Sequence, residues 1–351
     1  MLGLFACTGD VSEWIVDCDA HNGVEPFCGF SNPEDLVHFA PTGHLIASQF
    51  GSLDGTRPGN LVSFLPDDPQ PVILHPATDA DAPLQGWGSA DCPGPPGPAF
   101  SPRGLDLIER SNGRHALLVI NHGEREAVEY FEVEVDAGAQ GAMLLSWRGC
   151  VMLPEPLFLN DLVALADGGF WATHMYSRDA EISSVLKAVF GTDTGWVVEW
   201  RPQTGFYELP GTRAPMPNGI ARCAEERHVY LNAYFAGEVR RIEVDSGEVL
   251  ASVAVPHPDN LTWAGDGRLL VASHRSGLRQ IVECREGRVG TCAVAFSILA
   301  LDPEDLTAEV LLERDDVPMG AVSVALQVDD ALWLGTFAGD RVARMAYETA
   351  D

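Results

Sequence analysis

Carboxylate and carboxamide side chains recur in this sequence at the starts of short apolar segments. The starts are Glu34-Asp35, Arg103-Gly104, Asn160-Asp161, Asn218-Gly219 and Asp259-Asn260, and all but Arg103-Gly104 carry such side chains. If these segments converge, several acids and amides are buried together, which is costly unless something neutralises them. A hard cation neutralises them, and Ca²⁺ takes about six to eight oxygen ligands of this kind, whereas zinc would call for more histidine or cysteine. The pattern therefore predicts a calcium site.

Three of these starts carry two neighbouring polar residues, and this spacing predicts two positions for cations. Neighbouring residues of a strand point in opposite directions. One member of a pair, such as Glu34, then faces the mouth of a channel while the other, such as Asp35, faces its interior. We therefore expect two calcium ions.

The elements that must position these residues are short β-strands. Short apolar or alternating runs bounded by Gly, Pro and Asp recur from end to end, and long helical periodicity is nearly absent. One pattern of two strands joined by a turn returns six times, over residues 35–48, 104–122, 160–174, 218–232, 259–274 and 322–336. We predict an all-β, six-bladed β-propeller that forms a single domain over residues 1–351, because blades packed around an axis close one core. A two-sheet sandwich would not explain six copies.

One segment departs from the β pattern and predicts a short helix near residues 179–191. Asp179 is a candidate N-cap and Gly191 a candidate C-cap. The apolar residues recur at helical spacing, at Ile182, Val185, Leu186, Val189 and Phe190. Two placements are open: a lid over one mouth of the propeller, or a helix packed on its flank.

The eight cysteines form no CxxC pair and no zinc spacing. Cys284 and Cys292 flank a turn-like stretch and either form a disulfide in an oxidising compartment or remain buried thiols. Residues 4–7, Leu-Phe-Ala-Cys, resemble a bacterial lipoprotein cleavage box, although only six residues precede Cys7. The expected location is periplasmic, secreted or lipid-anchored if the start is truncated, and cytoplasmic otherwise.

Charge and hydropathy exclude two classes of partner. The chain has 22 Lys+Arg against 51 Asp+Glu, a formal net charge of −29. Nucleic-acid binding requires a basic face, which this composition lacks. A membrane helix needs ~20 predominantly apolar residues, and no such window occurs. We expect a small-molecule ligand, no nucleic acid and no membrane span.

Taken in order, the motifs resemble those of the serum paraoxonase/arylesterase family, which belongs to a wider group with the gluconolactonases and strictosidine synthases. The resemblance extends over essentially the whole chain, and its motifs are specific jointly, not singly. They are Asn-Pro-Glu-Asp-Leu (32–36), Ser-Pro-Arg-Gly-Leu (101–105), Val-Ile-Asn-His (119–122), Leu-Asn-Asp-Leu-Val-Ala (159–164), Pro-Asn-Gly-Ile (217–220) and Pro-Asp-Asn-Leu (258–261).

This resemblance implies a six-bladed propeller that holds one catalytic and one structural calcium ion and hydrolyses lactones and esters. The ligands implied for the structural ion are Asp35, Asp161 and the backbone carbonyl of Leu105. Those implied for the catalytic ion are Glu34, Asn160, Asn218, Asp259 and Asn260.

The family's histidine pair is only half present. His122 matches one member of this general-base pair, whereas the other falls on Arg103, which stays protonated and cannot accept a proton. Arg103 would then bind a substrate carboxylate or phosphate, or form an ion pair with one of the acids. His174 and His274 end the second strands of their repeats, where they either reach substrate in the channel or hydrogen-bond to the backbone.

We therefore predict a calcium-dependent hydrolase of lactones or carboxylic esters. Asp259 would act as general base or nucleophile, with His122, Asn160 and Asn218 completing the catalytic set. With Arg103 in place of its family partner, His122 is expected to lack the group that orients it. The alternatives are a calcium-stabilised propeller that binds a small molecule or protein without hydrolysis, and a bond-forming enzyme like strictosidine synthase.

Overall fold

A computed structural model describes residues 14–52, 56–75, 82–135, 142–284, 288–315 and 317–347. Within these ranges the chain forms six four-stranded antiparallel sheets. From the inner strand outward, the first three blades are β3 (Pro33–Phe39), β4 (His44–Gln49), β5 (Asn60–Leu65) and β6 (Asp68–His75); β7 (Pro102–Glu109), β8 (His115–Asn121), β9 (Ala127–Val135) and β10 (Met143–Met152); and β11 (Leu159–Ala164), β12 (Phe170–His174), β13 (Trp196–Arg201) and β14 (Gly205–Glu208).

The other three blades follow the same order. They are β15 (Pro217–Arg222), β16 (His228–Ala233), β17 (Glu238–Glu243) and β18 (Val249–Ala254); β19 (Pro258–Trp263), β20 (Leu269–His274), β22 (Phe296–Leu301) and β23 (Ala308–Arg314); and β24 (Val322–Val328), β25 (Ala331–Thr336), β26 (Arg341–Ala346) and β2 (Val24–Cys28).

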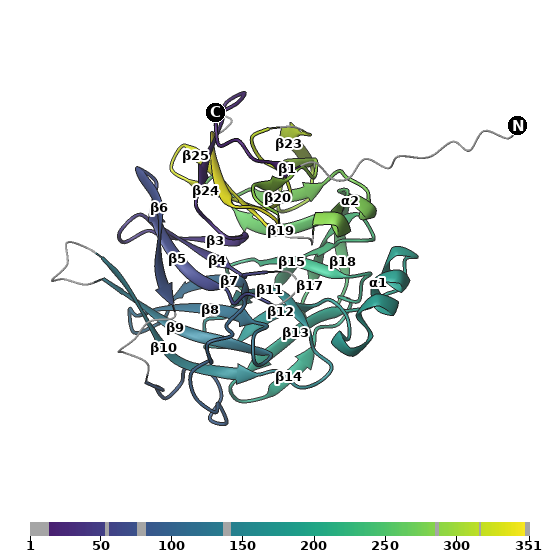
Figure 1. Ribbon diagram of the computed structural model, residues 1–351. Coiled ribbons are helices and arrows are strands. Elements are labelled where there is room, and N and C mark those ends of the chain that lie inside the picture. Colours follow the sequence, from purple (N-terminus) through teal and green to yellow (C-terminus); the bar gives the residue numbers. More distant parts are fainter. Residues whose placement is uncertain are drawn as a thin grey trace, which may run out of the picture.

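The six inner strands form a closed ring. Each contacts the next in the order β3, β7, β11, β15, β19, β24, and β24 contacts β3 again. These strands lie near the middle of the molecule, with the outer strands toward its periphery (Figure 1). The prediction of a six-bladed propeller is confirmed, because the six predicted repeats correspond to the two inner strands of the six blades.

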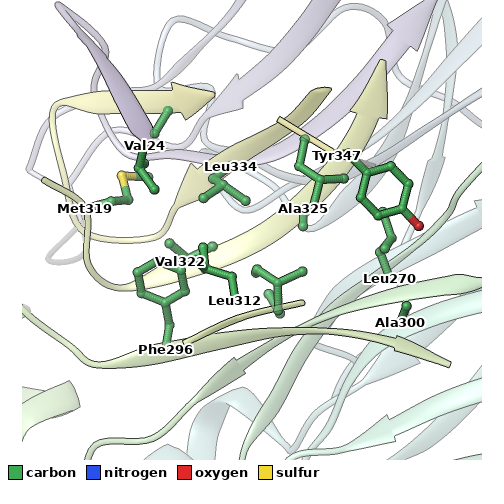
Figure 2. Packing of buried hydrophobic residues seen from close by; sticks show 14 of the residues in the cluster. Val24, Leu270, Phe296, Ala300, Leu312, Met319, Val322, Ala325, Leu334 and Tyr347 are labelled. Carbon is green, nitrogen blue, oxygen red and sulfur yellow. The ribbon is translucent and has the colours of Figure 1, made fainter. Parts of the chain in front are cut away.

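Apolar side chains fill the space between neighbouring blades. Figure 2 shows one such cluster, in which Leu270 and Phe296 of the fifth blade face Val322 and Leu334 of the sixth. All four side chains are at most 1% exposed. Each sheet therefore buries both of its faces, which a lone hairpin could not do, and the burial drives the blades together.

The last blade is assembled from both ends of the described chain. β2 pairs antiparallel with β26, so that a strand from the beginning completes a sheet whose other strands come from the end. β1 (Trp14–Ile15) pairs with β21 (Thr291–Cys292) nearby. Arg341 of β26 is fully buried and donates hydrogen bonds to the carbonyl oxygens of Ile15 at 2.9 Å, Asp17 at 2.6 Å and Pro318 at 3.0 Å.

Two helices follow second strands. The 3₁₀ turn η1 (Arg178–Ala180) leads into α1 (Glu181–Val189), and α2 (Leu278–Glu283) follows β20. The predicted helix is confirmed, but it begins after Asp179 because the 3₁₀ turn occupies that position, and its N-cap Ala180 makes no side-chain cap bond. The C-cap is Phe190, one residue before the expected Gly191, which follows it at φ +78° and donates to the Ala188 carbonyl at 2.8 Å.

Three disulfides link described residues, in the pairs Cys18–Cys28, Cys92–Cys150 and Cys284–Cys292. Of the two states considered for Cys284 and Cys292, the structure contains the disulfide. Residues 4–7, with the lipoprotein-like motif, lie outside the described residues. No helix in the described part of the chain is long and apolar enough to cross a membrane.

Replacement of Arg341 tests the closure of the ring. Arg341→Met should lower the free energy of unfolding by about 3 kcal/mol or more, because several buried carbonyls lose a charged donor. Chemical denaturation measures this change. The control is Arg344→Gln on the same strand, whose half-exposed guanidinium pairs with Glu25. Equal effects of the two variants would contradict the role given to Arg341.

Candidate functional site

The polar residues at the blade starts lie where each inner strand loses register with its neighbour. The ladder is interrupted between Pro33 and Asp35 in the first blade and between Leu159 and Leu162 in the third. The other inner strands have the same interruption between Pro102 and Leu105, Pro217 and Ile220, Pro258 and Leu261, and Val322 and Val324. Such irregularities re-aim side chains and release backbone groups from the ladder. All six therefore present backbone and side-chain groups to the channel at the same level.

Close approach between neighbouring blades explains two glycines at this level. A Cβ built on Gly219 would lie 2.2 Å from the Asp259 carbonyl oxygen, and one on Gly104 would lie 2.6 Å from the Asn160 carbonyl oxygen. No larger residue fits at either place without movement of the backbone. Asn218 and Arg103 each precede one of these glycines, so the close contact fixes their positions relative to the next blade.

Two cavities lie on opposite sides of this ring of polar residues, and we call them the upper and the lower cavity. The upper cavity, of about 130 Å³, is lined by residues that include Glu34, Asn160, Asn218 and Asp259. The lower cavity, of about 730 Å³, is lined by residues that include Asp35, Leu105 and Asp161. The pairs Glu34-Asp35 and Asn160-Asp161 therefore divide between the cavities, as the alternation along a strand requires.

The carboxylates of the upper cavity are buried without full neutralisation. Burial raises the pKa of Glu34 to about 7, although the positive charge of Arg103 opposes the rise. The pKa of Asp259 is raised well above its usual range by burial and then by the charge of Glu34. Oε2 of Glu34 and both side-chain polar atoms of Asn260 are buried and have no hydrogen-bond partner in the described residues.

The donor set of the upper cavity fits a hard cation. Two carboxylates and two amide side chains line it, the Asn260 amide is close enough to Glu34 to lower its pKa, and oxygen ligands of these types suit Ca²⁺. Among the described residues no group of three or more His, Cys, Asp and Glu side chains is suited to hold a metal, so amide oxygens must complete any coordination. The unpartnered oxygens would coordinate a bound cation, and its charge would offset the repulsion between Glu34 and Asp259.

The carboxylates of the lower cavity are satisfied differently, by backbone amides. Asp35 accepts hydrogen bonds from the N–H groups of Leu36 at 2.8 Å and Leu105 at 2.9 Å. Asp161 accepts from Leu162 at 2.7 Å and Ile220 at 2.9 Å. Each carboxylate thus joins its own strand to the inner strand of the next blade. Their mutual repulsion persists, since the charge of Asp35 adds to burial in raising the pKa of Asp161.

A third aspartate, Asp106, repeats this arrangement and was missed by the sequence analysis. It accepts from the N–H groups of Leu107 at 2.9 Å and Ala164 at 2.7 Å, and it lines the lower cavity. Burial raises its pKa to about 6. Asp106 lies two residues after Gly104 and so is not part of a polar pair at a strand start. The repeats therefore did not indicate that it would line the channel.

Arg103 lines the upper cavity beside the acids. Its guanidinium lies 5.6 Å from the centre of the Phe50 ring, and it makes no hydrogen bond or ion pair with any described residue. Of the two roles considered for Arg103, the ion pair with an acid is therefore not present in the described part of the chain.

His122 has an orienting partner, contrary to expectation. Its Nδ1 lies 2.6 Å from Oε2 of Glu126, four residues later, and its ring packs against Phe158 at 4.3 Å between centroids. Arg178 forms an ion pair with the other oxygen of Glu126. Burial, followed by the charges of Arg103 and Arg178, holds the pKa of His122 well below its usual range. In the sequence, the only indication that Glu126 is the partner of His122 is that the two residues are close along the chain.

The two other candidate histidines lie in different surroundings. His274 lines the upper cavity, where its Nε2 is 2.9 Å from the Val322 carbonyl and 3.4 Å from Oδ2 of Asp259. Its Nδ1 lies 3.0 Å from the Tyr234 hydroxyl. His174 is buried in the third blade, where its Nδ1 accepts from the Phe158 N–H at 3.0 Å. The structure therefore brings His274, but not His174, to the cavity lining.

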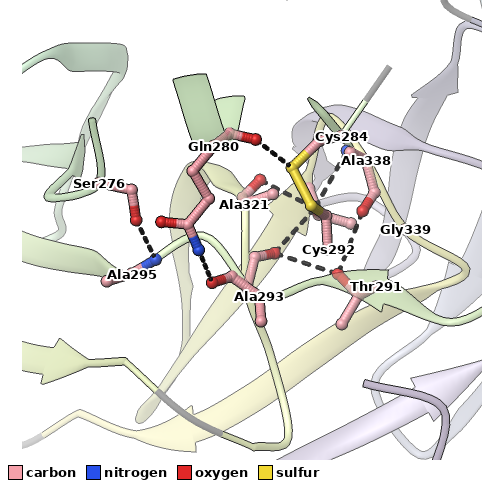
Figure 3. The surroundings of a disulfide bond; sticks show 12 residues. Ser276, Gln280, Cys284, Thr291, Cys292, Ala293, Ala295, Ala321, Ala338 and Gly339 are labelled. Atoms are coloured by element: carbon pink, nitrogen blue, oxygen red, sulfur yellow. Dashed lines mark hydrogen bonds between the residues drawn. A yellow bond between two sulfur atoms is a disulfide. The ribbon is translucent and has the colours of Figure 1, made fainter. Parts of the chain in front are cut away.

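Both helices contribute side chains to the upper cavity. Val185 of α1 and Ile281 and Val282 of α2 are among its lining residues, which favours the lid placement over the flank. In Figure 3 the disulfide from Cys284 to Cys292 links the end of α2 to the strand β21, and Gln280 donates to the Ala293 carbonyl at 2.8 Å. The second lid helix, α2, was not predicted.

Comparison with known proteins establishes the fold. No protein-family model and no curated protein matches the chain in sequence. Among solved structures, the chain is similar to a luciferin-regenerating enzyme, with TM-score 0.55 and 14% identity over 92% of this chain and 94% of that one.

Two further structures resemble the chain to the same degree. A gluconolactonase from Xanthomonas campestris has a TM-score of 0.53 and 15% identity, covering 93% of this chain and 89% of that one. Regucalcin, a calcium-binding protein from Agrobacterium tumefaciens, has a TM-score of 0.50 and 13% identity, covering 95% and 93%. At these identities the likeness shows a shared propeller fold and nothing more specific.

The raised pKa values predict how pH acts on the protein in excess chelator. Glu34 binds a proton more tightly in the folded state, with a pKa of about 7, than in the unfolded state near 4.5. The free energy of unfolding should therefore fall by a few kcal/mol as pH rises from about 4.5 to about 7. Glu34→Gln should flatten this slope, whereas Glu124→Gln at an exposed position should not. A stability that rises over this range would contradict the assignment.

Proposed function

We propose that the protein is a calcium-dependent hydrolase of lactones or carboxylic esters and that its motifs place it near the paraoxonase/arylesterase family. The observation that carries the proposal is the set of buried, unpartnered oxygen ligands at the upper cavity, beside Asp259. The names of two structural neighbours, a gluconolactonase and a calcium-binding protein, are consistent with this activity.

Glu34, Asn160, Asn218, Asp259 and Asn260 would hold the catalytic calcium ion. When bound, this ion supplies Lewis-acid polarisation of the carbonyl and stabilises the negative charge that develops on its oxygen. Asp35, Asp161 and the Leu105 carbonyl would hold the structural ion. Because the Asp35 and Asp161 carboxylates already accept backbone hydrogen bonds, we expect the upper ion to be the more important for activity.

Asp259 is suited to act as general base. It lines the cavity in which substrate would bind and stands beside the proposed cation, so its carboxylate can accept a proton from a water molecule held there. In the proposed step Asp259 removes a proton from water while the water oxygen bonds to the substrate carbonyl carbon. The C–O bond to the leaving oxygen then breaks, and this oxygen takes the proton back from Asp259.

His122 and Glu126 support a secondary role beside Asp259. A proton on Nδ1 shared with Glu126 leaves Nε2 as the acceptor atom, and Nε2 is buried with no partner in the described residues. His122 is not among the residues that line the upper cavity, whereas Asp259 is. We therefore assign proton transfer from water to Asp259.

A substrate panel tests the function as a whole. Lactones and aryl esters should be hydrolysed by the purified protein, and activity should be lost in excess chelator and restored by Ca²⁺. The melting temperature should fall in chelator and recover with Ca²⁺, because binding to the native state adds stability. Calcium-dependent stability without hydrolysis of any substrate would favour the non-hydrolytic alternative. An unchanged melting temperature in chelator would count against a calcium ion in the channel.

Three substitutions separate catalysis from structure. Asp259→Asn should retain the fold and lower kcat by roughly three powers of ten or more, since it removes the base, whereas Asp35→Asn should mainly lower the melting temperature. His122→Gln should cost less than about a hundredfold in kcat, the lower end of general-base effects. Steady-state kinetics and thermal unfolding of the three variants measure both properties.

The opposite ranking would replace this mechanism. If His122→Gln abolished hydrolysis while Asp259→Asn retained it, the base would be His122, oriented by Glu126. A large loss in both variants with intact folds would indicate that the two residues act together.

A further inference from the structure

Arg103 is an unpaired cation in the wall of the upper cavity. Most arginines of the described chain pair with acids, as Arg114 and Arg148 do with Glu132. Arg103 has no such partner among the described residues, even though the protein carries 51 acidic side chains. The planar guanidinium is therefore available for bidentate contact with a ligand anion.

The charges around Arg103 set the charge of that anion. Glu34 and Asp259 contribute two negative charges to the cavity when ionised, and Arg103 contributes one positive charge. With one divalent cation bound, the cation, Arg103 and the two carboxylates together carry a single positive charge. A histidine in place of Arg103, neutral at pH 7, would leave the cavity with no net charge. A monoanionic group neutralises this site, while a phosphate dianion would leave it negative beside two acids.

The remaining wall of the cavity is apolar. Met175, Met216, Phe235 and Phe337 line it together with side chains from the two lid helices. A ligand that fits this lining combines a hydrocarbon body with one charged end. The cavity volume of about 130 Å³ suits a small molecule rather than a peptide.

We propose that the substrate is a lactone or ester that carries a carboxylate, and that Arg103 binds this carboxylate. This inference rests on the proposed hydrolase function, and it adds the class of substrate. It also makes anion binding stronger with the cation, because the cation adds two positive charges to the cavity that receives the carboxylate.

Matched substrates test the assignment. The probes are a γ-lactone with a carboxymethyl substituent and the same lactone with the carboxylate replaced by a primary amide. Wild-type protein with Ca²⁺ should prefer the carboxylate form, and Arg103→Gln should raise KM for it by ~10-fold or more while the amide changes little. Arg103→Lys, which keeps the charge but loses the fork, should recover part of the affinity. The control is Arg275→Gln, which removes a positive charge that is not part of the cavity lining.

A binding measurement separates this inference from the hydrolase function. Calorimetry should detect binding of the monoanion butyrate to wild-type protein with Ca²⁺ and a loss of ~10-fold or more in affinity in Arg103→Gln, with weaker binding in chelator. Butyrate binding that requires Arg103, in a protein that hydrolyses neither lactone, would support the carboxylate site and refute the hydrolase.

Three outcomes would overturn the carboxylate site. One is hydrolysis of both lactones with equal KM by the wild type. Another is a parallel change for both lactones in Arg103→Gln. The third is tighter binding of inorganic phosphate than of butyrate, which would make the ligand a phosphate instead.

Discussion

Acidic side chains buried at the axis of the propeller are the constraint on which the rest of the structure depends. Glu34, Asp35, Asp161 and Asp259 are each at most 5% exposed, and burial raises the pKa of all four; repulsion from neighbouring acids adds to the rise at the three aspartates. Buried charges of one sign destabilise a fold unless they are compensated. The interrupted register of the inner strands supplies this compensation, because it frees backbone amides and aims the side chains at a common axis.

The two ends of the channel resolve this constraint in different ways. At the lower level, Asp35 and Asp161 are held by backbone N–H groups of the next blade, so the charges contribute to the ring itself. At the upper level, Glu34 and Asn260 keep buried atoms without partners, which the fold tolerates only where a ligand compensates them. The two levels of one set of strands therefore compensate their buried acids differently.

Much of this architecture could be predicted from the sequence, because a propeller repeats its local pattern. Six recurring strand pairs were enough to predict the blades, and the polar pairs predicted that neighbouring residues face opposite ways along the channel. Contacts between residues that do not repeat could not be predicted. Neither the Cys18–Cys28 bond nor the partner of His122 has a counterpart in other blades, and α2 is too short for its periodicity to be distinguished from a loop.

The closing blade links the order of synthesis to the assembly of the site. β2 is made near the beginning of the chain, but its hydrogen-bonding partner β26 is among the last strands to be made. Until then β3 has no β24 beside it, so the ring is open next to Glu34. A chain made only as far as the fifth blade therefore leaves its axial acids hydrated, although it already contains all of them. Burial of these acids consequently waits for the last blade, and it would distinguish chains with a closed ring from chains with an open one.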